Sequence, residues 1–290
     1  MRIPLPLLPL LPLLLGACDS DHELPLPAGA ALIEDRALSE MSGLEASPSV
    51  ADVFWSINDS GSWPRLFRLG ADGRALGRVR VDGAWLRDTE TLAVWREAAS
   101  GRDWLLIGDV GDNRGWRREV RVHAVPEPLP GQRSVRIAWS LRVRYPDGPR
   151  DVEGIAVDHR RGDLLLLSKR DTPARLYRVP LSAREVATPA TAEFLAALPV
   201  DAIDGEVTGL DLSKDGRLLA VLSYRGLYLW RRDGDADWAE VLAQPPQALP
   251  LPALRKAEAM AFGGRSDALF VGSERLPAPL LRIEFELRAN

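Results

Sequence analysis

The chain has few of the residues on which several kinds of functional site depend. It contains one cysteine and three histidines in 290 residues. None of the three is expected at the candidate site described below, which argues against a Ser-His-Asp triad and against a histidine zinc site there. No glycine-rich phosphate loop follows a strand and opens a helix, which argues against a nucleotide cofactor.

Lysine is also scarce, since only Lys169, Lys214 and Lys256 occur among the 37 basic residues. The formal net charge is −4, and removal of residues 1–17, which contain Arg2 as their one charged residue, would make it −5. A mildly acidic chain offers no electrostatic footprint for nucleic acid. After the first residues, no apolar stretch is long enough to span a membrane.

The N-terminus predicts export and lipidation. Arg2 precedes an apolar run from Leu5 to Leu15, which is shorter than the roughly 20 residues of a membrane span. The run ends in Leu15-Gly16-Ala17-Cys18, which resembles the lipobox of bacterial lipoproteins. We therefore expect residues 1–17 to be a signal peptide and Cys18 to carry the lipid anchor, because several acyl chains hold a protein stably on a membrane.

The segment after Cys18 is polar and rich in proline, which suits a lipidated tether over residues 18–29. The rest, 30–290, is expected to be a single, monomeric domain that faces the periplasm. Asp19 resembles the signal that keeps lipoproteins in the inner membrane of enteric bacteria, so it weakly favours that membrane over the outer one.

An internal repeat determines the predicted fold. A short strand with a small second residue occurs five times, at intervals of 48, 63, 55 and 50 residues measured at that position. Its copies are Ser42-Gly43-Leu44, Glu90-Thr91-Leu92, Glu153-Gly154-Ile155, Thr208-Gly209-Leu210 and Glu258-Ala259-Met260. Each copy leads through a Gly-, Asp- or Ser-rich turn to an apolar second strand that ends in a polar cluster. A third, alternating strand and a weaker fourth one follow.

Four strands in roughly 50 residues, repeated in this way, predict an all-β fold, a β-propeller of five four-stranded blades. The last copy leaves no room for a fourth strand before Asn290, so we expect residues Ala30 to Arg36 to pair with the C-terminal blade and close the ring. A sixth blade within the longest interval, over Ser134 to Tyr145, is the alternative.

Strand direction predicts that one rim of the channel collects the polar residues. The first residue of each inner strand and the last residue of the antiparallel second strand reach the same end of a blade. The turns between these strands lie at the opposite face, and we interpret them as structural. The candidate ligand-binding residues of the rim are Asp59, Asp88, Asp112, Asn113, Asp151, Lys169, Arg170, Tyr224, Arg225 and Arg275.

Converging carboxylates at the rim need compensation. Calcium takes 6–8 oxygen ligands, so Ca²⁺ held by Glu90, Asp109, Glu153 and Glu258 is one solution. Pairing of these acids with the arginines, without metal, is the other. Each glutamate could also simply cap backbone N–H groups, and Asx turns would explain the Asp109 to Asn113 loop equally well. None of the histidines is placed at this rim: His22 lies in the tether, His123 on a third strand and His159 at the opposite face.

A family resemblance adds to this interpretation. The stretch from Met41 to Pro128 resembles a group of secreted bacterial propellers through Asn58-Asp59-Ser60-Gly61, Asp88-Thr89-Glu90 and Gly108-Asp109-Val110-Gly111-Asp112-Asn113. Asp151-Val152-Glu153-Gly154-Ile155-Ala156 is similar, more loosely, to the SdiA-regulated and the phytase-like or esterase-like propellers. The relatives of known activity use acidic residues around Ca²⁺ to hydrolyse esters. A dense basic lining for a highly phosphorylated substrate is missing here, which argues against phytase activity.

Two functions are compatible with these features. The first is a lipid-anchored propeller that binds a ligand, an ion or a protein partner at its acidic rim without catalysis. The second is a Ca²⁺-dependent hydrolase of phosphoesters or carboxylic esters that uses the same rim. The scarcity of a positioned nucleophile or base favours the first.

Overall fold

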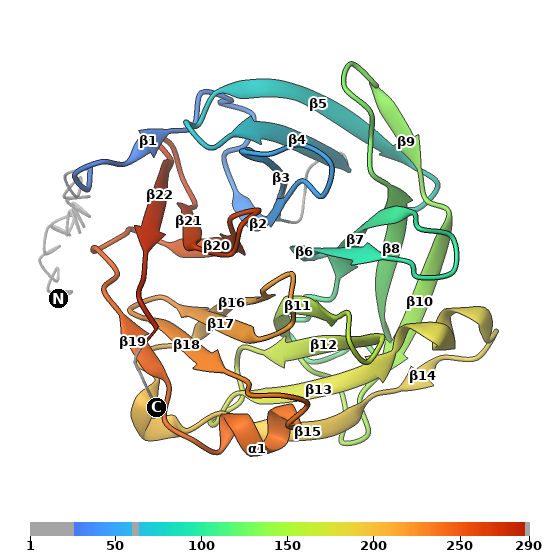
Figure 1. The fold of residues 1–290 in the computed structure, drawn as a ribbon. Helices are drawn as coiled ribbons and strands as arrows, with labels where there is room; N and C mark the ends of the chain where they lie inside the picture. Colours follow the sequence, from blue (N-terminus) through green and yellow to red (C-terminus); the bar gives the residue numbers. More distant parts are fainter. Residues whose placement is uncertain (1–25, 60–63, 288–290) are drawn as a thin grey trace, which may run out of the picture.

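Five small sheets surround a central channel in the computed structural model, which describes residues 26–59 and 64–287 (Figure 1). This confirms the predicted five-bladed β-propeller. The signal peptide, Cys18 and Asp19 lie outside the described residues, so the anchor stays a prediction. Within the described ranges, no helix combines the length and the apolar character needed to cross a bilayer.

Each blade contributes its innermost strand to the channel. These strands pack against one another around the ring, as Figure 1 shows. They are β2 (Met41–Ala46), β6 (Thr89–Arg96), β11 (Val152–Asp158), β16 (Val207–Leu212) and β20 (Ala257–Phe262). Small residues allow the close approach: a Cβ added to Gly154 would lie 2.5 Å from Cβ of Leu210 on the next blade. This contact explains the small second residue of the repeat.

The second strands are buried on both faces. They are β3 (Val53–Asn58), β7 (Asp103–Asp109), β12 (Asp163–Ser168), β17 (Leu218–Ser223) and β21 (Ala268–Ser273). In β12, Leu164 and Leu166 belong to the core shared with the preceding blade, whereas Leu165 and Leu167 belong to the core shared with the following one. Because every blade has two neighbours, an unbroken apolar run suits this position better than alternation. Five apolar cores, one between each pair of adjacent blades, result.

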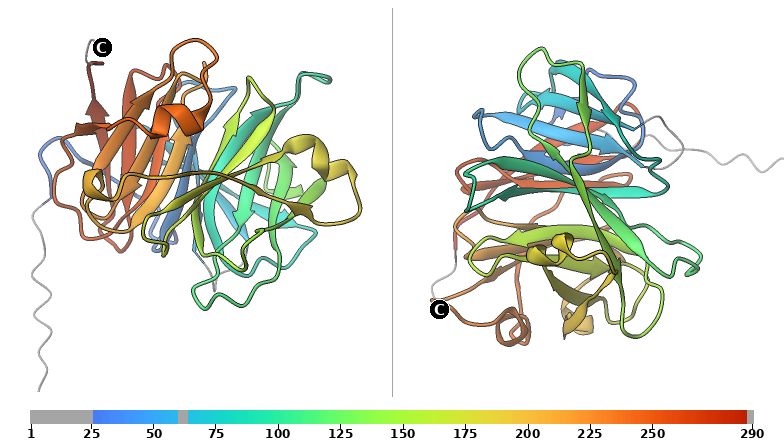
Figure 2. Two further views of the ribbon diagram at one scale, coloured as in Figure 1. Left: turned by 90° about the horizontal axis from the view of Figure 1, so that it is seen from below. Right: turned by 90° about the vertical axis from the view of Figure 1, so that its right-hand side faces the viewer.

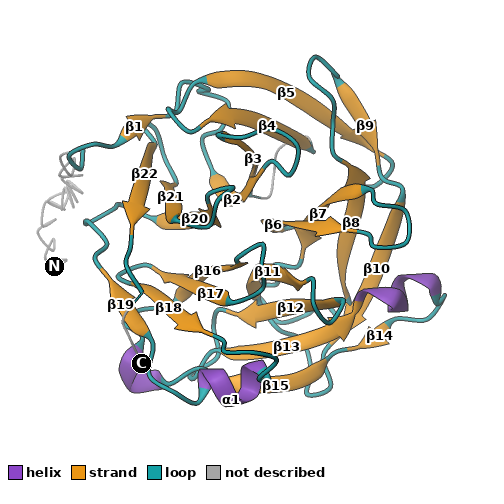
Figure 3. Ribbon diagram, in the orientation of Figure 1, coloured by secondary structure: helices purple, strands orange, loops and turns teal. Residues whose placement is uncertain are grey.

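The third strands alternate in burial only in part, against the prediction: Arg121 and Arg282 are exposed between buried neighbours, whereas Leu227 to Trp230 are all buried. The third strands are β4 (Arg65–Gly70), β8 (Val120–Pro126), β13 (Arg175–Pro180), β18 (Leu227–Arg231) and β22 (Pro279–Glu284). The outer strands are β5 (Ala75–Asp82), β10 (Trp139–Arg144), β15 (Glu193–Ala197), β19 (Gln247–Leu249) and β1 (Ala31–Leu32). In the described part of the chain, helical structure is confined to short segments on the outer connections, namely α1 (Trp238–Leu242), η1 (Leu181–Glu185) and η2 (Val200–Ala202) (Figure 3).

The six-blade alternative is wrong. Residues 134–145 contain two strands that join different sheets: β9 (Ser134–Arg136) pairs in parallel with β5 of the first blade, and β10 is the outer antiparallel strand of the second. A further short strand, β14 (Ala190–Thr191), pairs in parallel with β10. Two of the five blades therefore have five strands, and the longest repeat interval contains a strap between blades rather than an extra blade.

The N-terminal segment closes the ring as predicted, through a shorter strand than expected. β1 pairs antiparallel with β22, with Ala31 opposite Leu280. The next residue, Ile33, is buried and donates its backbone N–H to the carbonyl of Ala278 at 2.9 Å. The side views in Figure 2 show strands running between the two faces of the disc, with connecting loops at both faces.

Candidate functional site

A β-bulge occurs at the same point in all five blades. The inner-strand register shifts by one residue at Ser42, Glu90, Glu153, Thr208 and Glu258. All five side chains are buried. A bulge leaves one residue out of the ladder and turns its side chain away from the regular pattern. It therefore gives each blade one polar residue at the same end of the channel, which we call the bulge end.

Three carboxylates meet at the bulge end between the first and second blades. Oxygen atoms of Asp59, Asp88 and Glu90 lie within 4.8 Å of one another. Burial raises the pKa of Glu90 well above its usual range, and the charges of Glu153, Asp59 and Asp88 act in the same direction. Burial, with the charges of Asp59 and Asp151, raises the pKa of Asp88 to about 6. We call Asp59, Asp88 and Glu90 the acid group.

Neighbouring residues hold the acid group in place. Ser42 donates its hydroxyl to Oε2 of Glu90 at 3.0 Å, and Thr89 donates to the carbonyl of Asn58 at 2.9 Å. Gly111 packs its backbone directly against the carboxylates, because a Cβ there would lie 2.5 Å from Oε1 of Glu90 and 2.6 Å from Cγ of Asp88. The described residues of the three motifs, 58–61, 88–90 and 108–113, therefore lie close together.

A different arrangement surrounds the other two glutamates of the bulge end. Lys169 donates to Glu153 at 3.0 Å and lies 4.0 Å from Glu258. Its ammonium also lies 5.3 Å from the ring centre of Tyr224. Burial raises the pKa of Glu153 to about 7, although Lys169 acts in the opposite direction. Tyr224 donates its hydroxyl to Glu258. These two carboxylates therefore have a positive charge and hydrogen-bond donors of the protein itself beside them.

Asp109 has structural partners rather than a place in the acid group. Its carboxylate lies 2.9 Å from the guanidinium of Arg117 and 3.9 Å from Nε2 of His123, and it accepts the backbone N–H of Asp88 at 3.1 Å. Burial raises the pKa of Asp109, but the neighbouring His123 and the charge of Arg117 outweigh it, so that the pKa is lowered. Asp109 differs in this way from Glu90, with which it was grouped as a calcium ligand.

Side-chain-to-backbone hydrogen bonds hold the loop after Asp109, but they reach four and five residues along the chain and so do not form the predicted Asx turn. Asp112 accepts the backbone N–H groups of Trp116 and Arg117 at 2.9 and 2.8 Å. Asp151 accepts the N–H of Asp112 at 2.7 Å and also binds Arg170 at 2.7 Å. Arg170 in turn donates to Asn113.

Arg225 and Arg275 lie further from the carboxylates. Arg225 is exposed and its nearest acid is Asp204, at 3.6 Å. Arg275 is exposed at a backbone φ of +66°, and its N–H donates to the carbonyl of Ser39. Both residues belong to loops of the bulge end, but neither is paired with a glutamate of the inner strands.

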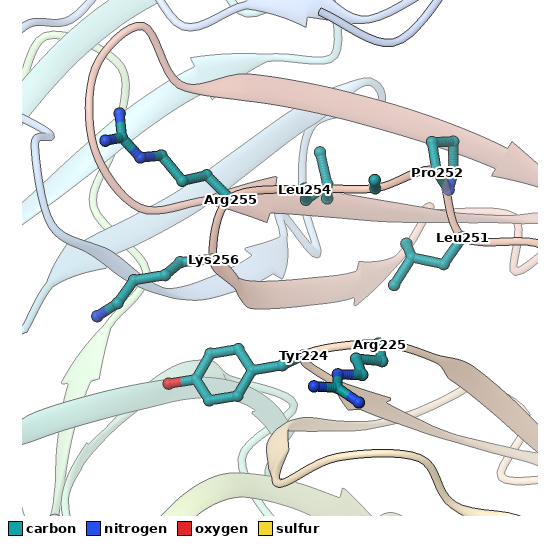
Figure 4. Close-up of a pocket in the computed structure, with 8 residues that line it drawn as sticks. Tyr224, Arg225, Leu251, Pro252, Leu254, Arg255 and Lys256 are labelled. Atoms are coloured by element: carbon teal, nitrogen blue, oxygen red, sulfur yellow. The ribbon is translucent and has the colours of Figure 1, made fainter. Parts of the chain in front are cut away.

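A cavity of about 630 Å³ opens beside Tyr224. Its walls are the loop at Tyr224 and Arg225 and the segment 251–256, which supplies Leu251, Leu254 and Lys256. Figure 4 shows Tyr224 and Lys256 extending in the same direction from these two walls. Lys256 lies 3.8 Å from Glu258 and 2.7 Å from Glu274. A basic and apolar cavity therefore adjoins the acidic channel.

Several residues of this arrangement were not predicted from the sequence. Arg117, Lys256 and Gly111 were not singled out, although each touches a predicted site residue. Glu45 and Asp211, two buried acids near the other end of the channel, were not predicted either. The signal for these two was available, because each stands three residues after a bulge residue, Ser42 or Thr208.

No known protein family and no curated protein matches the sequence. The fold is similar to that of a luciferin-regenerating enzyme, with 11% identity over 89% of this chain and 96% of that one and a TM-score of 0.47. It is also similar to a chain of a nidogen–laminin complex, with 16% identity over 80% of this chain and 72% of that one and a TM-score of 0.44. Neither likeness bears on function. The resemblance to the SdiA-regulated and phytase-like propellers stays a prediction.

Proposed function

We propose that this chain is a lipid-anchored binding protein of the bacterial periplasm that holds a divalent cation and a small ligand at the bulge end of its propeller. Cys18 attaches it to the membrane, and residues 18–29 act as the tether. The domain acts as a monomer and does not bind nucleic acid. The observation that carries the proposal is the acid group, three carboxylates within 4.8 Å of one another.

Asp88 and Glu90 differ from the other carboxylates of the bulge end in their charged neighbours. Glu153 and Glu258 have Lys169 beside them. Among the ion pairs of residues 26–59 and 64–287, none joins Asp88 or Glu90 to a lysine or arginine. Burial and the neighbouring carboxylates favour protonation or a bound cation at Asp88 and Glu90, against the smaller effects of Arg117 on Asp88 and Ser42 on Glu90. Calcium fits the donor set because it prefers carboxylate oxygens, and its remaining ligands would come from water or from the bound molecule.

The neighbouring cavity suggests the chemistry of the ligand. Tyr224, Arg225 and Lys256 present donors and positive charge beside Leu251 and Leu254. A cation in the acid group would add positive charge on the other side of the channel. A small molecule with a carboxylate or phosphate and an apolar part suits both the cavity and the bound cation. Charged groups at such a site fix the orientation of the ligand, and apolar walls supply contact area.

Calcium binding to paired variants tests the proposal. We expect calorimetry to detect Ca²⁺ binding to the wild-type protein, and Ca²⁺ to raise the melting temperature while EDTA lowers it. Glu90→Gln should weaken the affinity at least tenfold. Glu258→Gln is the matched control, because this residue has the same bulge position but binds Tyr224. Absence of any change with Ca²⁺ or EDTA, or equal losses in both variants, would contradict the proposal.

A Ca²⁺-dependent ester hydrolase is the second candidate, and one observation favours it. Glu153 has a pKa raised to about 7 by burial, which suits a general acid or base near neutral pH, and its charge acts on Glu90 of the acid group. A bound cation would polarise the ester. We would then expect turnover of a chromogenic phosphoester or carboxylic ester that Glu153→Gln abolishes. Binding of Ca²⁺ without turnover would exclude the hydrolase and support the binding function.

Lipidation is tested separately. A labelled fatty acid supplied to cells should attach to the wild-type chain and not to Cys18→Ala. The variant should also leave the membrane fraction, since one thiol carries the proposed anchor. Asp19→Ser, which removes the proposed inner-membrane signal, should shift the protein towards the outer membrane. Equal labelling of both chains would contradict the proposed anchor.

A further inference from the structure

A second cavity lies at the end of the channel opposite the bulges. Its volume is about 680 Å³. All five blades line it, through the turns that follow the inner strands, and examples are Ser47, Arg96, His159, Lys214 and Gly263. From the sequence, these turns are expected to be structural. Their convergence around one cavity on the channel axis shows that they also form a concave surface of ligand size.

Two acids stand where the inner strands meet this cavity. The residues three positions after the five bulge residues are Glu45, Ala93, Ala156, Asp211 and Ala261. Alanine at three of the positions leaves space beside the two long polar side chains. Both acids line the cavity and are at least nine-tenths buried. They come from the first and fourth blades, which are not adjacent in the ring, so they face each other across the channel.

Backbone hydrogen bonds fix the direction of both carboxyl groups. Asp211 accepts the N–H of Leu212 at 2.6 Å and the N–H of Phe262, on the next blade, at 2.7 Å. Glu45 accepts the N–H of Ala46 at 3.1 Å. Burial raises the pKa of Glu45 well above its usual range, and the charge of Asp211 adds to the effect. Burial also raises the pKa of Asp211 to about 7.

The walls and mouth of the cavity have a different chemistry. Phe54, Phe262 and Phe270 supply apolar wall. Burial lowers the pKa of His159, which keeps this imidazole neutral near pH 7. At the mouth, Arg96 is paired with Asp103 at 3.0 Å, and Glu97 is paired with Arg184 at 2.7 Å.

Further charged groups surround the mouth. Arg282 is paired with Glu284, and Asp52 and Asp267 belong to the turns. Lys214 and Arg265 are exposed and make no ion pair within the described part of the chain. The cavity therefore has an acidic floor, an apolar wall and two unpaired cations at its entrance.

We propose that this cavity is a second binding site, for a small molecule that carries a protonated amine at one end and an anionic group at the other. The amine lies against Glu45 and Asp211, the chain between the two charges contacts the phenylalanines, and the anionic group lies near Lys214 and Arg265. A cation between two buried carboxyl groups favours their ionised forms, so binding should release a proton. The site is independent of the cation site at the bulge end.

Three probes of one chain length test the proposal. They are 6-aminohexanoate, which has both charges, hexylamine, which has the amine alone, and hexanoate, which has the carboxylate alone. We expect calorimetry at millimolar concentration to show saturable binding in the order 6-aminohexanoate, hexylamine, hexanoate. In buffers of different ionisation enthalpy, the amines should release up to one proton for each molecule bound, whereas hexanoate should release none.

Variants locate the binding. Glu45→Gln keeps the shape and a hydrogen-bond acceptor, and it should weaken 6-aminohexanoate binding at least tenfold and lower the number of protons released for each molecule bound. Lys214→Gln should weaken 6-aminohexanoate binding several-fold and leave hexylamine unchanged. Glu258→Gln, at the bulge end, should change neither. Thermal melting verifies that each variant is folded. No saturable binding of either amine, or equal binding by wild type and Glu45→Gln, would overturn the proposal.

Discussion

Asp158 and Arg232 form a fully buried ion pair between the third and fourth blades. The guanidinium donates to both carboxylate oxygens, at 2.7 and 3.1 Å, and both side chains are 1% exposed. Trp238 donates its indole N–H to the same carboxylate at 3.1 Å, and Arg232 also donates to the carbonyl of Gly216 at 2.9 Å. Every polar group in this contact has a partner, which is the condition under which a buried ion pair is tolerated.

Removing one member of this pair should destabilise the propeller strongly. Arg232→Met would leave the carboxylate of Asp158 buried without a counter-ion, at a cost of about 3–5 kcal/mol. The double variant Asp158→Asn/Arg232→Met should recover part of the loss. Urea unfolding measures both. Arg80→Met, which removes an exposed pair with Asp82, is the control and should change the free energy of unfolding little. Equal losses for Arg232→Met and Arg80→Met would contradict this prediction.

The pair also predicts a contribution to acid unfolding. Burial raises the pKa of Asp158, but the hydrogen bonds and charge of Arg232 outweigh it and lower the pKa below its usual range. A lowered carboxyl pKa stabilises the native state above the unfolded value, about 3.9, and this stabilisation is lost as the pH falls further. The difference in unfolding free energy between wild type and Asp158→Asn should therefore shrink below about pH 4. A constant difference over that range would argue against it.

Asp211 predicts the opposite dependence. Burial raises its pKa to about 7, so between about pH 4 and pH 7 the native state holds a proton that the unfolded chain has released. The free energy of unfolding should fall as the pH rises through this range, and Asp211→Asn should make the slope shallower. Asp215→Asn is the control, because hydrogen bonding to Ser213 holds the pKa of Asp215 low against the effect of burial. A slope unchanged by Asp211→Asn would exclude this residue as its source.

Gly111 predicts a steric dependence of the acid group. A Cβ at this position would lie 2.5 Å from Oε1 of Glu90, closer than van der Waals contact allows, so Gly111→Ala must displace the carboxylates. We expect weaker Ca²⁺ binding by calorimetry than in the wild type, together with a lower melting temperature. Gly264→Ala is the matched control, because nothing lies within 4 Å of its added Cβ. Unaltered Ca²⁺ binding by Gly111→Ala would mean that the carboxylates do not need this position.

Ring closure depends on a buried side chain more than on the short strand before it. Ile33 is 5% exposed in the core between the last and first blades, whereas Leu32, which pairs in β1, is 45% exposed. Ile33→Ala should lower the free energy of unfolding by about 2–4 kcal/mol, because it removes buried methyl groups and leaves a cavity. Leu32→Ala should cost much less. Comparable losses, measured by urea unfolding, would indicate that the strand pairing itself closes the ring.

The sequence by itself determined the repeating unit and favoured five blades, and strand direction predicted that the polar residues at the starts of the inner strands share one end of the channel. The repeat encodes each blade locally: a small residue after a polar one, a turn, and an apolar second strand such as Leu164–Leu167. Neighbouring blades bury both faces of that strand, so an unbroken apolar run was informative. Pairing of the N-terminal segment with the last blade followed from the missing fourth strand.

Only the tertiary structure decided which charged groups meet. Glu90, Glu153 and Glu258 occupy the same position in the repeat, but one joins the acid group and the other two face Lys169, because their neighbours come from different blades. The strap from β9 to β10 crosses between two blades, and the charge of Asp211 acts on Glu45 from a blade that is not adjacent to it. Such contacts join residues far apart in the chain, and the closure of the ring, rather than any local pattern, sets the distances between them.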